Sequence, residues 1–291
     1  MTSTRAMPTE SAYRTDDALA AGARLLAAVS DTPRLDAELL VAFATRRTRS
    51  SVLASPERTL DAADAKLFRA LLARRARGEP LAYLTEEREF FSLPLAVSPS
   101  VLIPRAETEL LVELTLAALA SAARPAVLDV GTGSGAIALA IKRARGDAVV
   151  TATDRSAVAL AVARANAARL SLDVRFIESH WFEALGGEAF DVVVSNPPYV
   201  RSADVAGALA FEPRLALDGG TDGLDAYRSL FAAAAAHLDP RRGMLLVEHG
   251  AEQRPELDAL AQAHGWRVAA AHDDLAGRPR VLELALARGA P

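Results

Sequence analysis

The segment Asn196-Pro197-Pro198-Tyr199 combines residue types that could hold a planar nitrogen group in place for chemistry. Two consecutive prolines fix φ at both positions and remove two backbone donors, so the loop is stiff and presents carbonyl oxygens. The side-chain oxygen of Asn196 and the carbonyl of Pro197 could each accept one N–H bond from an amide or a conjugated amine. Because these N–H groups become more acidic as the nitrogen attacks, neutral acceptors bind the transition state more strongly than the ground state. Tyr199 could pack its ring against the planar group.

We therefore predict that Asn196, Pro197 and Tyr199 are catalytic, and that Pro198 completes a substrate-binding loop with them. The scheme needs no strong general base, since the nitrogen can release its proton to water after the transfer. The structural alternative is an Asn-Pro-Pro turn that only ends a strand. A second motif at the same predicted sheet edge argues against this alternative.

That second motif is a glycine-rich loop, which reads Asp129-Val130-Gly131-Thr132-Gly133-Ser134-Gly135. Glycine allows a tight turn and a close approach of the backbone to a ligand, because a Cβ would block it. A dinucleotide fingerprint would place its third glycine where Ala136 stands, and a triphosphate-binding loop would continue with Gly-Lys-Ser/Thr. Neither pattern is present. The spacing instead favours a ligand with an adenosine and an amino-acid tail but no phosphate, such as S-adenosylmethionine.

The next predicted strand ends in Asp154, where a carboxylate could accept both hydroxyls of a ribose. A lone Asp at a strand end is usually a helix cap, so Asp154 gains meaning only from the glycine loop. The predicted cofactor-binding residues of the two strands are Gly131, Thr132, Gly133, Ser134, Gly135 and Asp154. With the Asn-Pro-Pro-Tyr segment, they predict methyl transfer from S-adenosylmethionine to a planar amide or amine nitrogen, with S-adenosylhomocysteine as product.

A parallel sheet is needed to bring these motifs to one edge, and the pattern after Arg105 predicts one. Strands alternating with helices build an α/β fold with a mostly parallel sheet covered on both faces, which binds ligands at the carboxyl ends of its strands. We predict strands at 126–130, 148–153, 174–177, 190–195 and 244–248, with two weaker ones near Val268 and Val281. The predicted helices lie at 107–120, 136–145, 157–170, 225–238 and 252–263.

The first part of the chain has a helical pattern. From Asp16 to about Arg77, Ala and Leu recur at three-and-four spacing, as in Leu25, Leu26 and Val29, or Leu35, Leu39 and Leu40. We predict a small all-helical domain over residues 1–78. Strand-like alternation that includes Tyr83, Phe90 and Leu95 predicts a β-hairpin linker over 79–105. The remaining residues, 106–291, form the predicted methyltransferase domain.

Composition excludes several other classes of protein. The 291 residues, 51% of them hydrophobic, can bury a full core. A net charge of −4 and a pI near 5.8 argue against stable nucleic-acid binding. The absence of cysteine excludes disulfides and cysteine zinc sites, and five scattered histidines suggest no metal site. Without a signal-like start or an apolar run of roughly 20 residues, we predict a cytoplasmic protein without a membrane segment.

Several segments are similar to the HemK family, the peptide chain release factor glutamine N5-methyltransferases. The similarity runs from about Arg77 to Arg280 and is dense. The matching segments are RGEPLAYLT at 77–85, EFF at 89–91, VLIPRAETE at 101–109, LDVGTGSGAIAL at 128–139, SNPPY at 195–199, EP at 212–213 and DGL at 222–224. Together they are far more specific than the glycine loop alone.

The resemblance implies a Rossmann-like class I methyltransferase sheet, joined by a β-hairpin to a small helical N-terminal domain that binds release factors. It implies that the glycine loop and Asp154 bind S-adenosylmethionine and that Trp181 lies beside the adenine. It also implies that Asn196 contacts both cofactor and substrate, while Pro197, Pro198 and Tyr199 frame the glutamine of the Gly-Gly-Gln motif of class I release factors. We expect a monomer with this protein substrate.

Three positions depart from the family pattern. Glu86 stands where the family usually has Gly, so we expect a different hairpin turn, and Ala106 replaces a usual Pro. His180 precedes Trp181 where the family commonly has Asp, whose carboxylate could accept from the adenine amine. His180 is either a surface residue without a role or a contact of the ligand.

Other functions and roles stay open at this point. An adenine-N6 methyltransferase of nucleic acid would face the same chemical problem, although it would have to extract the base. A glutamine methyltransferase acting on a ribosomal protein would share the catalytic residues, and a non-enzymatic scaffold could share the fold. Arg105, Glu107 and Glu109 could be helix-dipole partners, or Arg105 could orient the substrate loop or pin the linker. The segments Glu212-Pro213 and Asp218-Gly219-Gly220 are interpreted as shaping the loop over the active site, and Glu248 as a buried structural carboxylate. The arginines of the helical part are interpreted as solvated charges, which an acidic surface of a release factor could also bind; they are Arg74, Arg75 and Arg77.

Overall fold

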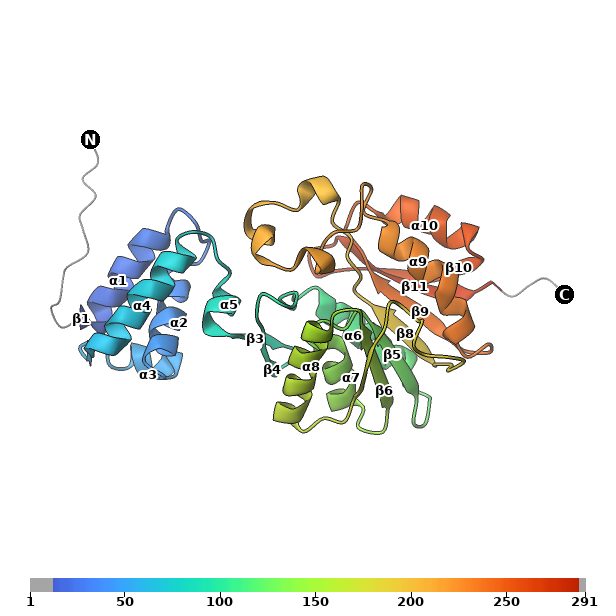
Figure 1. Ribbon diagram of the computed structural model, residues 1–291, viewed down its shortest axis with the longest axis horizontal. Coiled ribbons are helices and arrows are strands. Elements are labelled where there is room, and N and C mark those ends of the chain that lie inside the picture. The colour runs from blue at the N-terminus through green and yellow to red at the C-terminus, as the bar shows by residue number, and fades with distance from the viewer. Residues whose placement is uncertain (1–12, 288–291) are drawn as a thin grey trace. The chain divides into compact units, whose positions relative to one another are not determined.

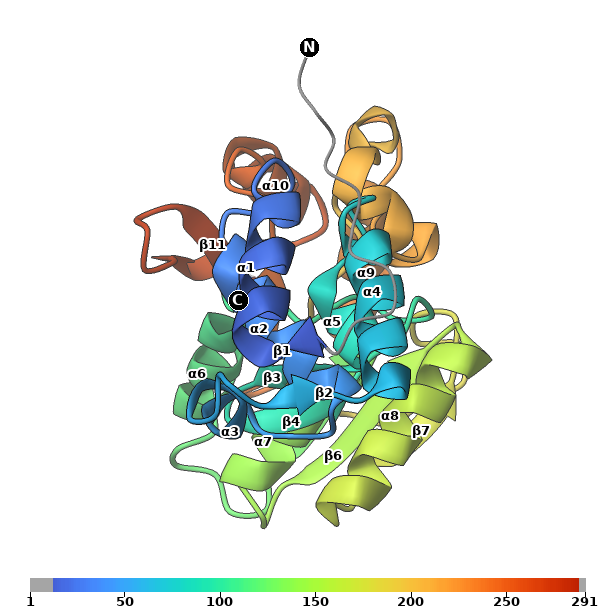
Figure 2. The same ribbon diagram turned by 90° about the vertical axis from the view of Figure 1, so that its left-hand side faces the viewer.

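The computed structural model describes residues 13–287, and the chain divides into two compact units, residues 1–86 and 87–291. In the first unit, three helices pack side by side around a shared core (Figure 2). They are α1 (Thr15–Leu26), α2 (Pro33–Ala44) and α4 (Ala62–Arg75). The shorter elements of this unit are α3 (Arg49–Leu53), α5 (Leu81–Thr85), β1 (Tyr13–Arg14) and β2 (Thr59–Leu60).

Local sequence signals explain where these helices begin. Pro33 opens α2, where its missing N–H is not needed, and the side chain of Asp61 caps α4 by accepting from the Asp64 N–H at 2.8 Å. The core contains Leu26 and Leu40, but Leu25 is 49% exposed. The strands β1 and β2 pair antiparallel, so the prediction of an all-helical unit misses this small element.

Two of the arginines interpreted as solvated charges are paired inside this unit. Arg75 Nε lies 2.8 Å from a carboxylate oxygen of the buried Asp36. Arg74 Nη2 lies 2.6 Å from a carboxylate oxygen of Glu79, and this pair lowers the pKa of Glu79. Arg74 and Arg75 are therefore ion-paired and not only solvated.

The predicted hairpin is present but shorter than expected. Its strands are β3 (Glu87–Phe90) and β4 (Leu93–Ala96), which pair antiparallel. The turn residues Phe91 and Ser92 both have positive φ, as in a type I′ turn. Glu109 Oε1 accepts from the Phe91 N–H at 2.9 Å, so this carboxylate supports the turn. The strand-like interpretation of Tyr83 is wrong, since Tyr83 lies in the helix α5, where it and Leu84 are both buried.

Glu86, the residue that follows α5, has a left-handed backbone with φ 59°. This conformation strains a residue with a Cβ, and glycine adopts it freely. We expect Glu86→Gly to raise the free energy of unfolding by about 1 kcal/mol, measured by urea denaturation. Glu86→Ala removes the same charge without relieving the strain, so an equal gain from both variants would contradict this explanation.

The second unit contains a seven-stranded sheet in the order β10-β11-β9-β8-β5-β6-β7. Neighbours from β7 to β9 run parallel, whereas β11 runs antiparallel to β9 and β10 antiparallel to β11. The strands are β5 (Ala126–Val130), β6 (Val149–Asp154), β7 (Arg175–Glu178), β8 (Val192–Ser195), β9 (Met244–Glu248), β10 (Trp266–Asp273) and β11 (Pro279–Leu286). All seven predicted strands are confirmed, with small differences at their ends.

Helices cover both faces of this sheet (Figure 1). They are α6 (Thr108–Ala118), α7 (Ala136–Ala144), α8 (Ala157–Leu170), α9 (Asp225–Ala233), which continues as the 3₁₀ turn η4 (Ala234–His237), and α10 (Arg254–Ala263). Val127 and Val192 pack with α6 to α8, whereas Leu128 and Val193 pack with α9 and α10. Successive residues of a strand point to opposite faces of the sheet. A continuous apolar run therefore contributes side chains to the hydrophobic core on each face.

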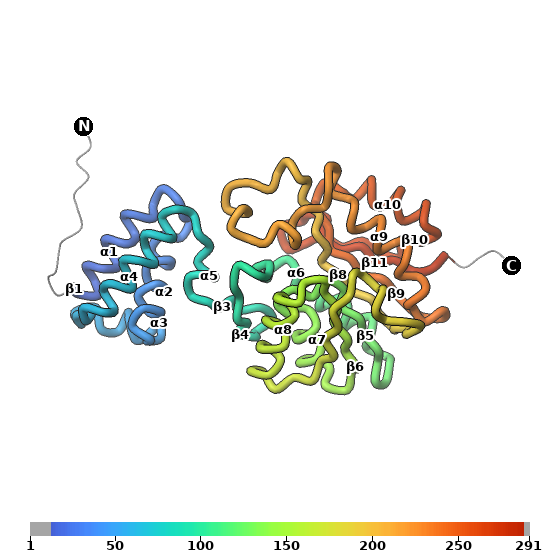
Figure 3. Tube along the Cα trace, in the orientation of Figure 1, coloured from blue at the N-terminus to red at the C-terminus, as the bar shows by residue number. Residues whose placement is uncertain are grey.

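The order in which strands are added to the sheet reverses at β5, which has β6 on one side and β8 on the other. At such a switch point the loops after two neighbouring parallel strands diverge and leave a crevice for a ligand. The loop after β8 is long, and Figure 3 shows it as an excursion from the strand ends. It contains the 3₁₀ turns η1 (Ser202–Asp204), η2 (Gly207–Phe211) and η3 (Arg214–Ala216). None of the helices described between residues 13 and 287 has the length and apolarity to cross a bilayer.

Candidate active site

A cavity of about 680 Å³ lies at the carboxyl ends of β5, β6 and β8. Both predicted motifs contribute to its wall, and the loop after β8 adds a third part. The lining residues include Leu102, Gly131, Gly133, Asp154, His180, Trp181, Asn196, Pro197, Pro198, Ser202, Asp218, Gly220 and Asp225. The Rossmann-like fold therefore brings the two motifs together, as the sequence predicts.

The three glycines of the loop have different roles. Gly131 and Gly133 line the cavity at φ values of 77° and 55°, and a Cβ built on either would meet no atom within 4 Å. The space beside these two backbones is open to a ligand. Gly135 instead packs against α8, where a Cβ would lie 3.2 Å from the Cβ of Ala163. The absence of a Cβ at Gly135 therefore allows the glycine loop to pack closely against α8. Gly135 does not line the cavity.

Thr132 and Ser134 are buried and support the loop from behind. The Thr132 hydroxyl donates to Asp129 Oδ2 at 2.6 Å, and the same oxygen accepts from the Ala138 N–H at 3.1 Å. Burial raises the pKa of Asp129 to about 7, against the effect of these two donors. The Ser134 carbonyl accepts from Asn166 Nδ2 at 3.0 Å.

Asn166 connects the glycine loop to the hairpin. Its Oδ1 accepts from the Ala96 N–H at 2.7 Å, and its Nδ2 donates to the Ala96 carbonyl at 3.0 Å as well as to Ser134. The side chain is fully buried, and both its donors and its acceptor are used. The hairpin therefore positions the glycine loop through one side chain of α8.

Asp154 lies at the end of β6 and lines the cavity. Its Oδ2 accepts from the Gly133 N–H and its Oδ1 from the Ser156 N–H, both at 2.9 Å. Burial raises its pKa, and the two backbone donors oppose that rise. Each oxygen keeps a second acceptor site, so the carboxylate can still bind a pair of hydroxyl groups.

Trp181 and His180 also line the cavity, next to Asp154 along the β6–β7 edge. The Ser179 N–H donates to the Asp154 carbonyl at 3.0 Å, which brings this turn to the end of β6. Trp181 packs against the core on the α9 side of the sheet. His180 is half exposed, and its Nδ1 lies 3.1 Å from Glu183 Oε1. It therefore already has a partner on the surface.

Asn196, Pro197 and Pro198 line the cavity directly after β8. The Asn196 Nδ2 donates to the Thr108 Oγ1 at 3.1 Å, which leaves the side-chain oxygen as an acceptor for another group. Ser195, the last residue of β8, donates its hydroxyl to the Val130 carbonyl at 2.7 Å and ties the two motifs together.

Tyr199 differs from its three neighbours because the cavity wall does not include it. Its ring packs against the core on the α9 side, and its hydroxyl donates to Glu248 Oε1 at 3.4 Å. Burial raises the pKa of Tyr199 to about 12. The residue anchors the loop in this structure, and contact of its ring with a substrate remains a prediction.

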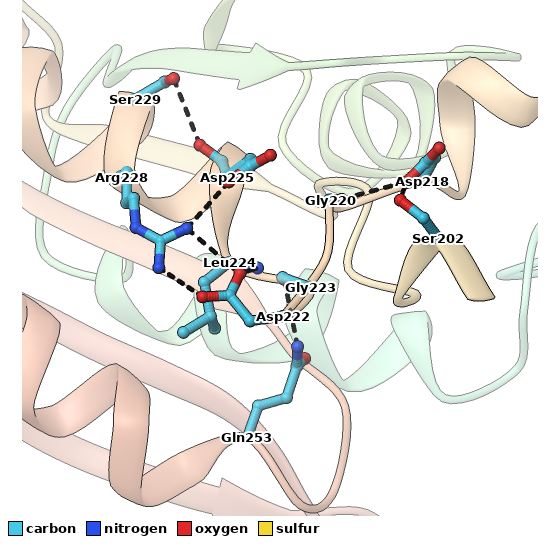
Figure 4. Close-up of polar contacts among 10 residues, drawn as sticks. All are labelled: Ser202, Asp218, Gly220, Asp222, Gly223, Leu224, Asp225, Arg228, Ser229 and Gln253. Carbon is cyan, nitrogen blue, oxygen red and sulfur yellow. Dashed lines mark hydrogen bonds and ion pairs between the residues drawn. The ribbon is translucent and has the colours of Figure 1, made fainter. Parts of the chain in front are cut away.

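A network of polar contacts holds the loop after β8 against the rest of the unit. Gln253 Nε2 donates to the carbonyls of Tyr199 and Gly223, both at 3.1 Å, and its Oε1 accepts from the Gly250 N–H at 2.9 Å. Figure 4 shows Gln253 reaching Gly223 from one side, while Arg228 contacts Asp222 and Asp225 from the other. Further contacts in this view join Ser202 and Gly220 to Asp218.

We expect Gly223→Ala to disturb this network strongly. A Cβ at Gly223 would lie 2.5 Å from the Tyr199 carbonyl oxygen, and the residue also has φ 79°. Gly277 provides a matched control, since it has φ 72° but no atom within 4 Å of a built Cβ. By urea denaturation, Gly277→Ala should cost about 1 kcal/mol from backbone strain and Gly223→Ala about 3 kcal/mol. Equal costs would show that the close approach to Tyr199 is unimportant.

Arg105 and Glu212 join the segment before α6 to the same loop. Glu212 is buried, forms an ion pair with Arg105, and accepts from the Ile103 N–H at 3.0 Å. The interpretation that Arg105 orients the substrate loop or pins the linker agrees with this ion pair, because Arg105 ends the linker and Glu212 lies in the loop after β8. Leu102, which precedes Ile103, lines the cavity. No signal in the sequence pattern identified Leu102 or Thr108 as part of the site.

Two protein-family models match the chain, one in each of its two compact units. A model described as the PrmC N-terminal domain matches residues 17–85. A second model, described as the methyltransferase small domain, matches residues 106–212. Among solved structures, a methyltransferase from Pyrococcus furiosus matches with a TM-score of 0.50 and 20% sequence identity, over 68% of this chain and 90% of that chain. This likeness shows the methyltransferase fold alone.

Several curated relatives carry the name release factor glutamine methyltransferase. The protein of that name from Burkholderia pseudomallei is 46% identical, over 90% of this chain and 94% of that protein. The protein of that name from Xylella fastidiosa is 47% identical, over 89% of this chain and 95% of that protein. The one from Salmonella typhimurium is 43% identical, over 87% of this chain and 92% of that protein. With relatives of this identity and coverage, the chain belongs to the release factor glutamine methyltransferase family.

Proposed function

We propose that this protein transfers the methyl group of S-adenosylmethionine to the side-chain amide nitrogen, N5, of the glutamine in the Gly-Gly-Gln motif of class I peptide chain release factors. One observation carries the proposal. A single cavity is lined by two open glycines, the Asp154 carboxylate and the stiff segment Asn196 to Pro198. Membership of the family supports the identity of the substrate.

The residues of the cavity suit the proposed cofactor. Gly131 and Gly133 have no Cβ where open space borders the backbone, and Asp154 supplies a carboxylate able to accept hydroxyl protons. Trp181 offers an aromatic surface that can pack on a planar base. When bound, S-adenosylmethionine supplies a methyl group activated by its positively charged sulfur.

The protein's contribution to the reaction is orientation by uncharged acceptors. An amide nitrogen is a weak nucleophile because its lone pair is conjugated with the carbonyl. The Asn196 side-chain oxygen and the Pro197 carbonyl each accept a hydrogen bond from one N–H of this amide, and together they fix the orientation of its nitrogen. These acceptors bind more strongly as the nitrogen becomes pyramidal and its N–H groups become more acidic, so they lower the barrier. The proton then passes to water.

The proposal assigns a role to each part of the chain. Residues 1–78 bind the release factor, residues 79–105 form the linker, and residues 106–291 carry out methyl transfer. The PrmC N-terminal domain model matches residues 17–85, which cover most of the first part and the start of the linker. The enzyme acts as a monomer in the cytoplasm, where its proposed substrate takes part in translation, and it does not bind nucleic acid stably.

A mass measurement tests the substrate. The protein is incubated with S-adenosylmethionine and a class I release factor, and the tryptic peptide that carries Gly-Gly-Gln is weighed before and after. We expect this peptide to gain the mass of one methyl group on its glutamine. Ribosomal proteins and adenine-containing DNA are incubated in parallel. Methylation of either of these, with an unchanged release factor, would overturn the proposal.

A further inference from the structure

Leu215 lies on the wall of the cavity, and yet the residue is 45% exposed. Other large apolar side chains of residues 13–287 are exposed as well, among them Val158 and Leu275, but Leu215 alone of this group lines the cavity. Its neighbours Pro213 and Ala216 line the same cavity. Because covering an apolar side chain removes it from water, this part of the wall favours contact with the carbon atoms of a ligand.

The turn that carries Leu215 is fixed on its C-terminal side. The Val200 N–H donates to the Leu217 carbonyl at 2.9 Å, and the Gly219 N–H donates to the Val200 carbonyl at 2.8 Å. A Cβ built on Gly219 would lie 2.8 Å from the Pro198 carbonyl oxygen, so the two backbones are in close contact. The residues after Leu215 therefore pack directly on the Asn-Pro-Pro-Tyr segment.

The same turn is also fixed on its N-terminal side and within itself. Glu212 is buried, and its Oε2 accepts from the Ile103 N–H at 3.0 Å. The Arg214 side chain donates to Asp218 Oδ2 at 2.8 Å, while the Asp218 N–H donates to the Arg214 carbonyl, also at 2.8 Å. Leu215 is therefore held between two anchored positions, and its exposure is not that of a loose loop tip.

We propose that Leu215 is a specificity-determining residue, which packs on the backbone of the residue before the target glutamine and restricts that position to glycine. The inference rests on the proposed function, since it names a residue that selects the sequence around the methylated glutamine. It also gives a purpose to the loop-shaping interpretation of Glu212-Pro213 and Asp218-Gly219-Gly220, because these segments hold Leu215 in place.

The reason for the restriction is the fixed position of an apolar wall beside the catalytic segment. In the proposed function the glutamine amide binds at Asn196 and Pro197, so the peptide next to this glutamine passes Pro198 and the turn that packs on it. A glycine brings only its backbone to Leu215. A residue with a side chain meets a wall that is anchored at both ends, and such steric conflict excludes the wrong substrate.

The test measures the methylation of two class I release factors that differ in one residue, one with Gly-Gly-Gln and a variant with Gly-Ala-Gln. With the unmodified enzyme we expect kcat/KM to be about 30-fold lower for the alanine variant. One additional carbon in a fixed apolar site changes this ratio by about 10- to 200-fold. In Leu215→Ala the difference between the two substrates should shrink to about threefold, because the truncated side chain leaves room for the additional methyl group.

Three further measurements show that the effect belongs to the substrate side of the cavity. Leu215→Ala should lower kcat/KM for Gly-Gly-Gln by about tenfold, since an apolar contact is lost. Its dissociation constant for S-adenosylmethionine should change by less than about threefold. Leu215→Met keeps a large apolar side chain and should retain most of the discrimination. Leu275→Ala is the matched control, because Leu275 is exposed and does not line the cavity, and both substrates should react as with the unmodified enzyme.

The outcomes separate this inference from the function on which it rests. An unmodified enzyme that methylates both release factors equally well, or a Leu215→Ala variant that still discriminates about 30-fold, would overturn the specificity role and leave the proposed function intact. Weakened S-adenosylmethionine binding in Leu215→Ala would also overturn it, since the turn would then support the cofactor. A release factor with Gly-Gly-Gln that gains no methyl group from the unmodified enzyme would instead overturn the proposed function.

Discussion

Asn196→Ala is expected to lower kcat by about 10²- to 10³-fold, because it removes one of the two oxygens that orient the substrate amide. The dissociation constant of S-adenosylmethionine should change by less than about threefold, since Gly131, Gly133 and Asp154, which line the cavity, are unchanged in this variant. Turnover is measured with labelled S-adenosylmethionine and a class I release factor, and cofactor binding by calorimetry.

The design of this experiment separates chemistry from folding. Asn196 donates to Thr108 at 3.1 Å, so the alanine variant also loses one hydrogen bond and should be about 1 kcal/mol less stable. A matched urea denaturation therefore accompanies the kinetics. A variant that stays folded and keeps normal turnover would refute the role of the Asn196 oxygen.

Asp154→Ala is expected to have the largest effect on cofactor binding, weakening the affinity for S-adenosylmethionine by about 100-fold. A hydrogen bond to a charged acceptor contributes about 1.5 to 3 kcal/mol, so the net loss of one such bond already accounts for an effect of about this size, and this carboxylate also orders the loop through the Gly133 N–H at 2.9 Å. At saturating cofactor, kcat should recover most of its value, because Asp154 does not contact the nitrogen that reacts.

Asp147→Ala is the matched control for the loss of one negative charge. Asp147 forms an ion pair with Arg145 at 2.9 Å and is 44% exposed, and it does not line the cavity. Calorimetry should give a dissociation constant close to that of the unmodified protein. An Asp154→Ala variant that binds S-adenosylmethionine as tightly as Asp147→Ala does would show that Asp154 is not a cofactor ligand.

The sheet could be predicted from the sequence because its strands carry their own signal. Runs such as Val192 to Val194 are apolar at every position, as strands buried on both faces must be. The glycine loop that begins at Gly131 also predicts where β5 ends, and Pro197 and Pro198 predict where β8 ends. Including Tyr83 in the strand-like alternation of the linker was wrong, since a segment as short as residues 81–85 cannot separate the helical period from the strand period.

The site was less predictable where a side chain's role depends on a distant partner. Gly135 and Gly131 belong to one motif, but only the packing of α8 shows that Gly135 faces Ala163 and not the cavity. Thr108 and Asn196 are far apart in sequence, and no local pattern indicates that they form a hydrogen bond. The placement of Tyr199 over Glu248 likewise follows from how the loop packs on β9.

The most direct test of the mechanism is a crystal structure of the protein with S-adenosylhomocysteine and a Gly-Gly-Gln peptide. The account predicts that the glutamine NH2 group donates one hydrogen bond to the Asn196 side-chain oxygen and one to the Pro197 carbonyl, with donor–acceptor distances of about 3 Å. The glutamine nitrogen should then face the cofactor sulfur. A bound glutamine whose nitrogen contacts neither oxygen would contradict the mechanism and leave only the family assignment.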